Sequence, residues 1–546
     1  MDHSLAIGAV VESMAPAAWI AELLHRLEEH ASFELDVVIH DVEPQEPTPI
    51  ARIGQCQRIA NKILFSYIDK PLFKHDPVLP TPLPPGVTIS PATALGSCDV
   101  ILNLTSSALP AHWFGACNTP PVWCAHEQTL DARVTDALLA RAPMLWIHLW
   151  AQTGSNGTDS CIASHSLPRQ TYSPSDLARA SRLCLPAVFV SRLQWLAAGT
   201  DLSVQETGLV EDAALSVTQE RQALETQAAK LANNHFTPSL RSGPMTLLSV
   251  VQLWWQQTFQ RIASRLWYEQ WELAIYQHGD TTLSLVDQLT LTPVHAYTSL
   301  PTPDKTWWAD PHLCQHEGSA YLFFEEMKVG GARAHLSVAR LHEDGQLSNI
   351  HEVIKEQYHL SYPFMMTHDG ETYMLPETAS QRSVTLYKAQ QFPDQWQPVK
   401  HLLDDVDLAD TTVHFYQGRW WMFANSMSHR CVDERDELNI YHAQDLQGPW
   451  QAHPLNPVLT GVDRARMAGP IVVENNQLFR LSQYGAHRYG YGVNLNRIDN
   501  LSTTSYGETP VRRLVPETGS TWLGCHSITY MNGVTVLDRV RRRRRF

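Results

Sequence analysis

A motif that recurs five times in the second half of the chain limits its fold more than any other feature. Each copy has a short apolar strand, a polar turn with Gly, Asn or Asp, and a second strand rich in aromatic or β-branched residues, which predicts a β-hairpin. Successive copies start roughly 50–60 residues apart, enough for about four short strands each. The spacing predicts a five-bladed β-propeller over residues 281–540. The copies begin at Trp308, Ser361, Ala409, Ala468 and Gly524.

A propeller brings the innermost strand of every blade to one axis, where ligand sites form. The inner strands are expected to open at Asp310, Tyr362, Asp410, Gly469 and His526. Two axial carboxylates repel each other unless one is protonated or a cation lies between them. Asp310 and Asp410 are therefore candidate catalytic residues, with turn capping as the alternative. His526 is a candidate metal or water ligand, with a hydrogen-bonded core histidine as the alternative, so a divalent cation on the axis is possible.

Aromatic and acidic residues flank these positions. Trp307 and Trp308 precede Asp310 and could stack on a sugar ring. Glu325 and Glu326 end the second strand of the first blade, and strand alternation points only one of them inward. Glu326 and Glu377 are candidate catalytic residues that could donate a proton. Alternatively, they are solvated charges at the rim of the propeller.

Basic residues supply a second candidate group. Arg466, with Arg464, Gln483, Arg488 and Tyr489, could bind a phosphate or carboxylate, or could form an ordinary surface loop. Tyr362 is a further candidate substrate-binding residue, because it opens the second inner strand. The run Arg541, Arg542, Arg543, Arg544 and Arg545 is expected to follow the last strand as a basic tail over 541–546. Such a tail could touch anionic lipid or nucleic acid, or could be a disordered terminus with no partner.

The first half of the chain has a different pattern. Apolar runs at 5–11, 34–41, 98–104 and 143–150, with a helical pattern at 17–30, predict an α/β domain over residues 1–200. A Rossmann-like, mostly parallel sheet is expected there. Residues 201–280 are predicted to form a helical linker, including an aromatic-rich helix at 246–271. Strands are expected at 283–297, leading into the propeller.

Composition narrows the class of partner and the compartment. A formal net charge of −15 over 546 residues argues against nucleic acid as a partner. No apolar run reaches the ~18 residues of a spanning helix. The start Met1-Asp2-His3 lacks the basic region of a signal peptide, and the nine cysteines are scattered. We therefore expect a cytoplasmic protein with reduced thiols and no nucleic-acid partner.

The repeat region resembles the five-bladed propellers of family 43 glycoside hydrolases. Asp310 within Ala-Asp-Pro, Asp410 and His526 match that family's motifs in kind and order. The resemblance implies that Asp310 is a base, that Asp410 tunes its pKa, and that His526 holds a metal or water. It departs at Ala468, where the family places its glutamic acid. That departure argues against ordinary hydrolysis, because a leaving alkoxide needs a proton donor.

A closer resemblance is to the propeller domain named after the N-terminal region of plant glucosamine inositolphosphorylceramide transferase. It rests on motifs such as WADP at 308–311, SYPF at 361–364, RWWMFA at 419–424 and GCHS at 524–527. The resemblance implies a carbohydrate-active enzyme that performs glycosyl transfer in surface-glycan or glycolipid biosynthesis. Its expected partners are a sugar or nucleotide-sugar and a glycan or glycolipid acceptor. The alternatives are a non-catalytic glycan-binding propeller and a family 43-like hydrolase with a relocated acid.

The first half resembles formyltransferase domains of the Rossmann type. The similar segments are CDVILNLTSSALP at 98–110 and IASHSLPRQTYSPSDLARASR at 162–182. The segment at 118–128 lacks the HxSLLPxxRG pattern of that family. The resemblance therefore implies a degenerate or repurposed domain, and active formyl transfer ranks below the carbohydrate activities.

Overall fold

The computed structural model describes residues 4–40, 81–91, 95, 97–105, 122–124, 144–152, 160–168, 174–198, 266–278, 285–429 and 435–544, except 86, 293 and 518. The chain divides into two compact units. The first contains Met1–Phe259 with Ser428–Glu434, and the second contains Gln260–Met427 with Arg435–Phe546.

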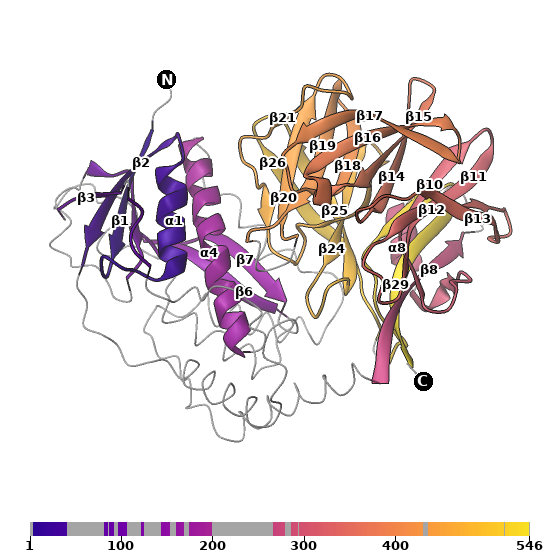
Figure 1. Cartoon of the computed structure of the whole chain (residues 1–546), viewed down its shortest axis with the longest axis horizontal. Helices are drawn as coiled ribbons and strands as arrows, with labels where there is room; N and C mark the ends of the chain where they lie inside the picture. The colour runs from indigo at the N-terminus through magenta and orange to yellow at the C-terminus, as the bar shows by residue number, and fades with distance from the viewer. Residues whose placement is uncertain are drawn as a thin grey trace. The chain divides into compact units, whose positions relative to one another are not determined.

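The first unit contains a seven-stranded sheet in the order β3-β2-β1-β4-β5-β6-β7 (Figure 1). The pairings from β3 to β5 are parallel, and those joining β5, β6 and β7 are antiparallel. The strands are β1 (Leu5–Val11), β2 (Phe33–Ile39), β3 (Thr88–Ile89), β4 (Val100–Asn103), β5 (Val122–Cys124), β6 (Met144–Gln152) and β7 (Ser160–Pro168).

Two helices are described in this unit, α1 (Ala18–Glu28) and α4 (Pro174–Ala197). Helix α1 buries Trp19, Leu23 and Leu27 at helical spacing, which gives it one apolar face. The predicted strand at 5–11 coincides with β1, and the predicted helix at 17–30 contains α1. The Rossmann-like and formyltransferase-like assignments stay predictions. Most of the predicted helical linker, residues 201–265, lies outside the described residues.

The second unit confirms the five-bladed propeller (Figure 1). Each of its first four blades begins with the strand nearest the axis. The first blade contains β10 (Thr306–His316), β11 (Ser319–Lys328), β12 (His335–Leu341) and β13 (Leu347–Ile354), and the second contains β14 (Ser361–His368), β15 (Glu371–Glu377), β16 (Ser383–Gln391) and β17 (Gln395–Asp404). The third contains β18 (Ala409–Tyr416), β19 (Arg419–Ser426), β20 (Glu437–Ala443), β21 (Gln451–Ala452) and β22 (Leu459–Thr460). The fourth contains β23 (Met467–Glu474), β24 (Gln477–Tyr484), β25 (Gly492–Leu501) and β26 (Tyr506–Leu514).

The fifth blade joins strands from both ends of this unit. Strands β27 (Trp522–Gly524) and β28 (Ile528–Met531) pair with β29 (Val534–Arg544), which pairs with β8 (Trp267–Gln277) and then β9 (Thr298–Ser299). The ring is closed because the first and last strands of the unit lie in one sheet.

This closure corrects three expectations from the sequence. Residues 267–271 are part of a strand rather than of a helix, so the first strand of the propeller precedes residue 281. Arg541–Arg544 belong to β29 rather than to a tail, and Arg545 lies outside the described residues. The expected strand near 283–291 is the helix α8 (Leu285–Leu291), followed by the 3₁₀ turn Val294–Ala296. The pairing of β8 with β29 joins segments about 270 residues apart along the chain, which no local pattern signals.

The first four inner strands share a β-bulge at equivalent positions. Their pairing register breaks between Ala309 and His312 and at the matching sites of β14, β18 and β23. A bulge redirects a side chain out of the regular pleat. One residue inside each break has positive φ; these residues are Asp310 (49°), Tyr362 (44°), Asp410 (52°) and Gly469 (150°). The predicted heads of these strands are therefore the positions that the bulges redirect.

Replacing Gly469 by alanine is expected to lower the free energy of unfolding by about 1–3 kcal/mol. An added Cβ would lie 2.1 Å from the carbonyl oxygen of Ile528, and the φ of 150° disfavours a side chain. Urea unfolding measures the change. Gly507→Ala is the control, because no atom lies within 4 Å of its added Cβ. Equal stability of the two variants would contradict this account of the close approach.

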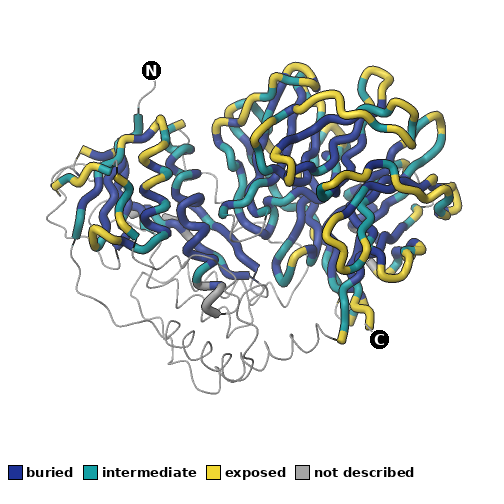
Figure 2. Tube along the Cα trace, viewed as in Figure 1, coloured by how far each residue is buried: buried dark blue, intermediate teal, exposed yellow. Residues whose placement is uncertain are grey.

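The inner strands of the propeller are largely buried (Figure 2). Within the described ranges, no helix has the length and apolar character needed to cross a membrane. In the propeller, Cys314 and Cys525 are buried free thiols.

Candidate active site on the propeller axis

Four acidic side chains from three blades lie close enough to feel one another's charge. Asp310 and Asp410 lie in the bulges of β10 and β18 and are buried. Glu325 on β11 and Glu377 at the end of β15 each feel the charge of Asp310. We call Asp310, Glu325, Glu377 and Asp410 the axial cluster.

Asp310 has contacts from two neighbouring blades. Its Oδ2 accepts a hydrogen bond from the backbone N–H of Tyr362 at 3.3 Å, and its Oδ1 lies 3.3 Å from Nε2 of His526. Burial raises the pKa of Asp310 to about 6; His526 opposes this rise, whereas Asp410 adds to it. A carboxylate with this pKa is deprotonated near neutral pH and still basic enough to accept a proton.

Arg466 joins the axial cluster through Asp410. Its Nε donates a hydrogen bond to Oδ2 of Asp410 at 2.6 Å, and its guanidinium carbon lies 5.0 Å from the centre of the Tyr489 ring. Burial would lower the pKa of Arg466, but Asp410 outweighs it and the pKa is raised, so the cation is permanent. Gln483 does not line the cluster as expected: its N–H donates to the carbonyl of Arg466 and its Nε2 to that of Met467. Gln483 therefore holds the backbone of Arg466 and Met467.

The structure decides between Glu325 and Glu326. Burial, followed by the charges of Asp310 and Glu377, raises the pKa of Glu325 well above its usual value. Glu326, the residue named from the sequence, instead accepts a hydrogen bond from Oγ of Ser337 at 3.0 Å within the blade. The prediction from the sequence that Glu326 is the site residue is therefore corrected to Glu325. The register of β11 against the bulged strand β10 turns Glu325 inward.

Glu377 has the properties of a proton donor. Burial raises its pKa to about 7; Asp410 adds to the rise, and Arg466 and Arg435 oppose it. Among the described residues, no hydrogen bond holds its carboxylate. The protonated form of Glu377 is therefore accessible near neutral pH.

Replacing Glu377 by glutamine is expected to raise the free energy of unfolding by about 1–3 kcal/mol at about pH 8 and to leave it nearly unchanged near pH 4. The raised pKa means that Glu377 ionises in the folded protein only with difficulty, so wild-type stability falls as the pH rises from about 4.5 through about 7. Chemical unfolding at both pH values measures this. Glu371→Gln, on the exposed part of the same strand, is the control. A stabilisation that is equal at both pH values would contradict the raised pKa.

The aromatic residues have roles other than those expected. Trp308 is only 1% exposed and packs in its blade against Phe324, with ring centres 4.8 Å apart, so it cannot stack on a ligand. Trp307 is half-buried and donates from Nε1 to the carbonyl of Glu269. The hydroxyl of Tyr362 lies 2.8 Å from Oγ1 of Thr412, so Tyr362 links two inner strands in the buried core.

Two other aromatic rings lie against His526. The ring centre of Trp271 is 4.3 Å from that of His526, and the ring centre of Tyr489 is 5.3 Å away. Tyr489 is 38% exposed, which places it at the solvent side of the cluster. Trp271 was missed because its strand was expected to be a linker helix. The expected substrate-binding residue Arg488 instead holds Glu269 through both carboxylate oxygens, at 2.8 and 2.5 Å.

His526, Asp310 and Asp538 form the candidate metal centre. Their ligand atoms lie within 4.8 Å of one another and are buried. Oδ1 of Asp538 accepts the backbone N–H groups of His526 and Ser527, and its Oδ2 lies 2.8 Å from Nδ1 of His526. Burial would lower the pKa of His526, but Asp538 and Asp310 outweigh it and raise that pKa. The residues fit a divalent cation held by Asp310 and Nε2 of His526, with Asp538 orienting the imidazole.

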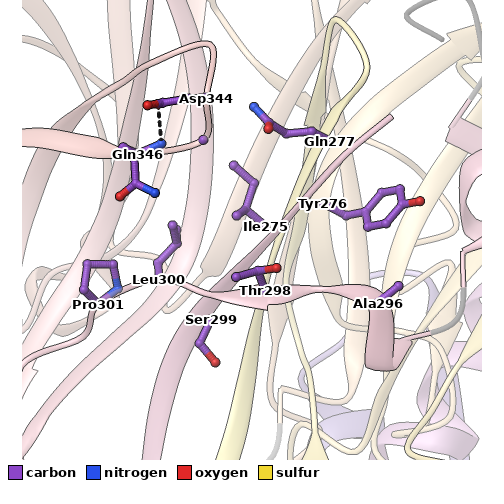
Figure 3. A pocket seen from close by; sticks show the side chains of 11 residues that line it. Ile275, Tyr276, Gln277, Ala296, Thr298, Ser299, Leu300, Pro301, Asp344 and Gln346 are labelled. Carbon is purple, nitrogen blue, oxygen red and sulfur yellow. Dashed lines mark hydrogen bonds between the residues drawn. The ribbon is translucent and has the colours of Figure 1, made fainter. Parts of the chain in front are cut away.

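A separate pocket of about 310 Å³ lies between β8, β9 and the turn at 344–346 (Figure 3). Its lining includes Tyr276, Thr298 and Gln346 but none of the axial cluster. We therefore leave it out of the candidate site.

Comparisons with known proteins agree with the propeller. Residues 292–527 match the family described as "Glucosamine inositolphosphorylceramide transferase 1, N-terminal". Proteins of that name from Oryza sativa subsp. japonica and Arabidopsis thaliana are 32% and 28% identical over 212 and 206 residues, which are 38% and 37% of this chain. The matches span only 28% and 27% of those relatives.

Solved structures with a similar arrangement include glycoside hydrolases. A family 117 glycoside hydrolase from Zobellia galactanivorans is 12% identical, with a TM-score of 0.33 over 50% of this chain and 91% of its own. A GH43 protein from Bacillus licheniformis is 16% identical, with a TM-score of 0.30 over 40% of this chain and 47% of its own. The fold assignment rests on the strand pairing described above. The propeller of this chain is thus a domain similar to the N-terminal domain of glucosamine inositolphosphorylceramide transferase 1.

Proposed function

We propose that the axial cluster transfers a sugar from a nucleotide-sugar to a hydroxyl group of a glycan or glycolipid. The observation that carries this proposal is that one cluster contains both a buried base, Asp310, and a permanent cation, Arg466, which is bonded to Asp410. The likeness of the propeller to the plant transferases supports it.

In the proposed reaction, Asp310 accepts the proton of the acceptor hydroxyl group. The hydroxyl oxygen forms a bond to the anomeric carbon while the bond from that carbon to the donor phosphate breaks. The departing diphosphate takes the electron pair, and Arg466 balances its negative charge. A divalent cation held by Asp310 and His526 would supply further positive charge for phosphate oxygens.

This chemistry accounts for the residue at the head of the fourth blade. Ala468 is buried and cannot donate a proton, whereas a leaving alkoxide would require a proton donor there. A leaving diphosphate is weakly basic and departs without one. The raised pKa values of Glu325 and Glu377 also favour their neutral forms, which can donate hydrogen bonds to an anionic donor instead of repelling it.

Glu377 also supports a second candidate function, a glycoside hydrolase with a relocated acid. Its pKa of about 7 and its lack of a hydrogen-bond partner among the described residues suit a general acid. The cytoplasmic location stays a prediction in either case.

An assay with labelled nucleotide-sugars and glycan or glycolipid acceptors tests the proposal. We expect one donor to give a labelled acceptor and a free nucleotide in equal amounts. Release of free sugar from an aryl glycoside, with no labelled acceptor, would favour the hydrolase. Glycan binding without turnover that persists in Asp310→Asn would identify a binding module instead.

A further inference from the structure

The end of the fifth blade is an arginine-rich ribbon of two strands. We define the arginine ribbon as residues 267–271 of β8 and 540–544 of β29, which pair from Trp271 with Val540 to Trp267 with Arg544. Strand β27 pairs with β29 only as far as Arg541, so the last residues have no third strand among those described. Figure 1 shows β8 and β29 projecting from the propeller at the C-terminal end of the chain.

On one face of β29, at and beside the ribbon, three arginines lie around a single acidic side chain. Arg539, Arg541 and Arg543 alternate along β29 and therefore point to one side. All three reach the carboxylate of the buried Glu272, at 2.8, 3.0 and 3.4 Å. Three guanidinium groups thus share one carboxylate, and the side chain of Arg543 remains 48% exposed.

The other face has two further exposed arginines. Arg542 has no ion pair among the described residues, and the described contact of Arg544 is with the ring of Trp267, at 5.2 Å from its centre. Glu269 lies opposite Arg542 in the pairing but is held by Arg488 through both oxygens. The positive charge of Arg542 and Arg544 is therefore not neutralised within the ribbon.

Apolar and aromatic side chains accompany these charges. Leu266, next to the ribbon, is 52% exposed, and Trp267 and Tyr268 are half-buried. The surface at the ribbon end is intermediate to exposed (Figure 2). Tryptophan, tyrosine and leucine beside arginine form the combination that favours the interface of a bilayer with anionic head groups. A soluble anion would need the cations but not the exposed leucine.

We propose that the arginine ribbon docks the propeller on an anionic lipid bilayer. The chain has a net charge of −15, so an anionic membrane repels most of its surface and attracts this ribbon. Trp271, at the inner end of the ribbon, contacts His526 beside the axial cluster. Docking would therefore bring the solvent side of the cluster towards lipid head groups. This surface goes beyond the proposed glycosyl transfer and does not depend on it.

Co-sedimentation of the full chain with lipid vesicles tests the proposal. We expect wild type to bind vesicles of phosphatidylcholine mixed with phosphatidylglycerol much more tightly than vesicles of phosphatidylcholine alone, and to be released by high salt. Replacing both Arg542 and Arg544 by glutamine should weaken binding to the mixed vesicles about thirtyfold. The control replaces Arg340 and Arg497, two exposed arginines elsewhere on the propeller, and should change binding less than about threefold.

Three results would overturn the proposal. The first is equal binding of wild type to both kinds of vesicle, and the second is unchanged vesicle binding by the variant Arg542→Gln/Arg544→Gln. The third is that this variant loses affinity for a soluble nucleotide diphosphate but keeps its affinity for vesicles. The last result would make the ribbon a soluble-anion site. Thermal unfolding shows whether each variant is folded. Asp310→Asn should keep full vesicle binding, so failure of the docking surface and failure of the glycosyl-transfer proposal give different results.

Discussion

Replacing Asp310 by asparagine is expected to lower the rate of glycosyl transfer about a thousandfold. Asparagine keeps the shape of the side chain and can accept the hydrogen bond from the N–H of Tyr362, but it cannot take up the proton of the acceptor hydroxyl group. The loss should appear in kcat, because the base acts in the transition state rather than in binding of the donor.

The pH dependence gives a second measure of the same base. Burial raises the pKa of Asp310 to about 6, and Asp310 must be deprotonated to accept a proton. The wild-type rate should therefore fall as the pH drops below about 6. Asp304→Asn makes the same chemical change in the exposed turn before β10 and should leave the rate unchanged. A rate for Asp310→Asn within about tenfold of wild type would exclude Asp310 as the base.

Replacing Arg480 by methionine is expected to lower the free energy of unfolding by about 3–5 kcal/mol. Arg480 and Glu508 form an ion pair whose side chains are both 0% exposed, with two bonds of 2.7 Å. Arg480 also donates to the carbonyl groups of Arg464 and Ala465, beside Arg466. Removing it leaves the charge of Glu508 buried without a cation, with the hydroxyl of Tyr506 still donating to it, and frees the segment that carries Arg466.

Urea unfolding of Arg480→Met and of a matched surface variant measures this difference. Arg497→Met removes an arginine from its pair with Asp499, where the side chains are 44% and 38% exposed. That variant should lose no more than about 1 kcal/mol. Adding Glu508→Leu to Arg480→Met should recover part of the loss, because the unpaired charge is removed. Equal losses in Arg480→Met and Arg497→Met would show that the buried pair adds nothing to stability.

The repeat alone was sufficient to predict the blades and their inner strands. The hairpins are local features, since a polar turn between two apolar strands brings neighbouring segments together whatever the rest of the chain does. The heads of those strands follow from the same alignment, so Asp310 and Asp410 could be named as neighbours in one site from their positions in the motif. Arg466 was named as a basic residue before the fourth inner strand, but its bond to Asp410 could not be foreseen.

The errors lie where distant segments meet. Alternation indicated that either Glu325 or Glu326 points inward, but the register set by the bulge in β10 selects Glu325. Trp308 was expected at the ligand because it precedes Asp310, yet the pleat turns it into the blade core. Trp271 carried no signal, because its place beside His526 depends on β8 joining the fifth blade.

The sequence by itself determined the number of blades and, for the first four blades, the residues that come to lie in the inner-strand bulges, because repetition and hairpin chemistry act over short stretches of chain. Only the tertiary structure decided how the ring closes, which glutamate joins the axial cluster, and that Arg541–Arg544 lie in a strand rather than in a tail. Pairing between β8 and β29 spans about 270 residues, and its register depends on side chains from both strands at once. A local pattern in either strand does not contain that information.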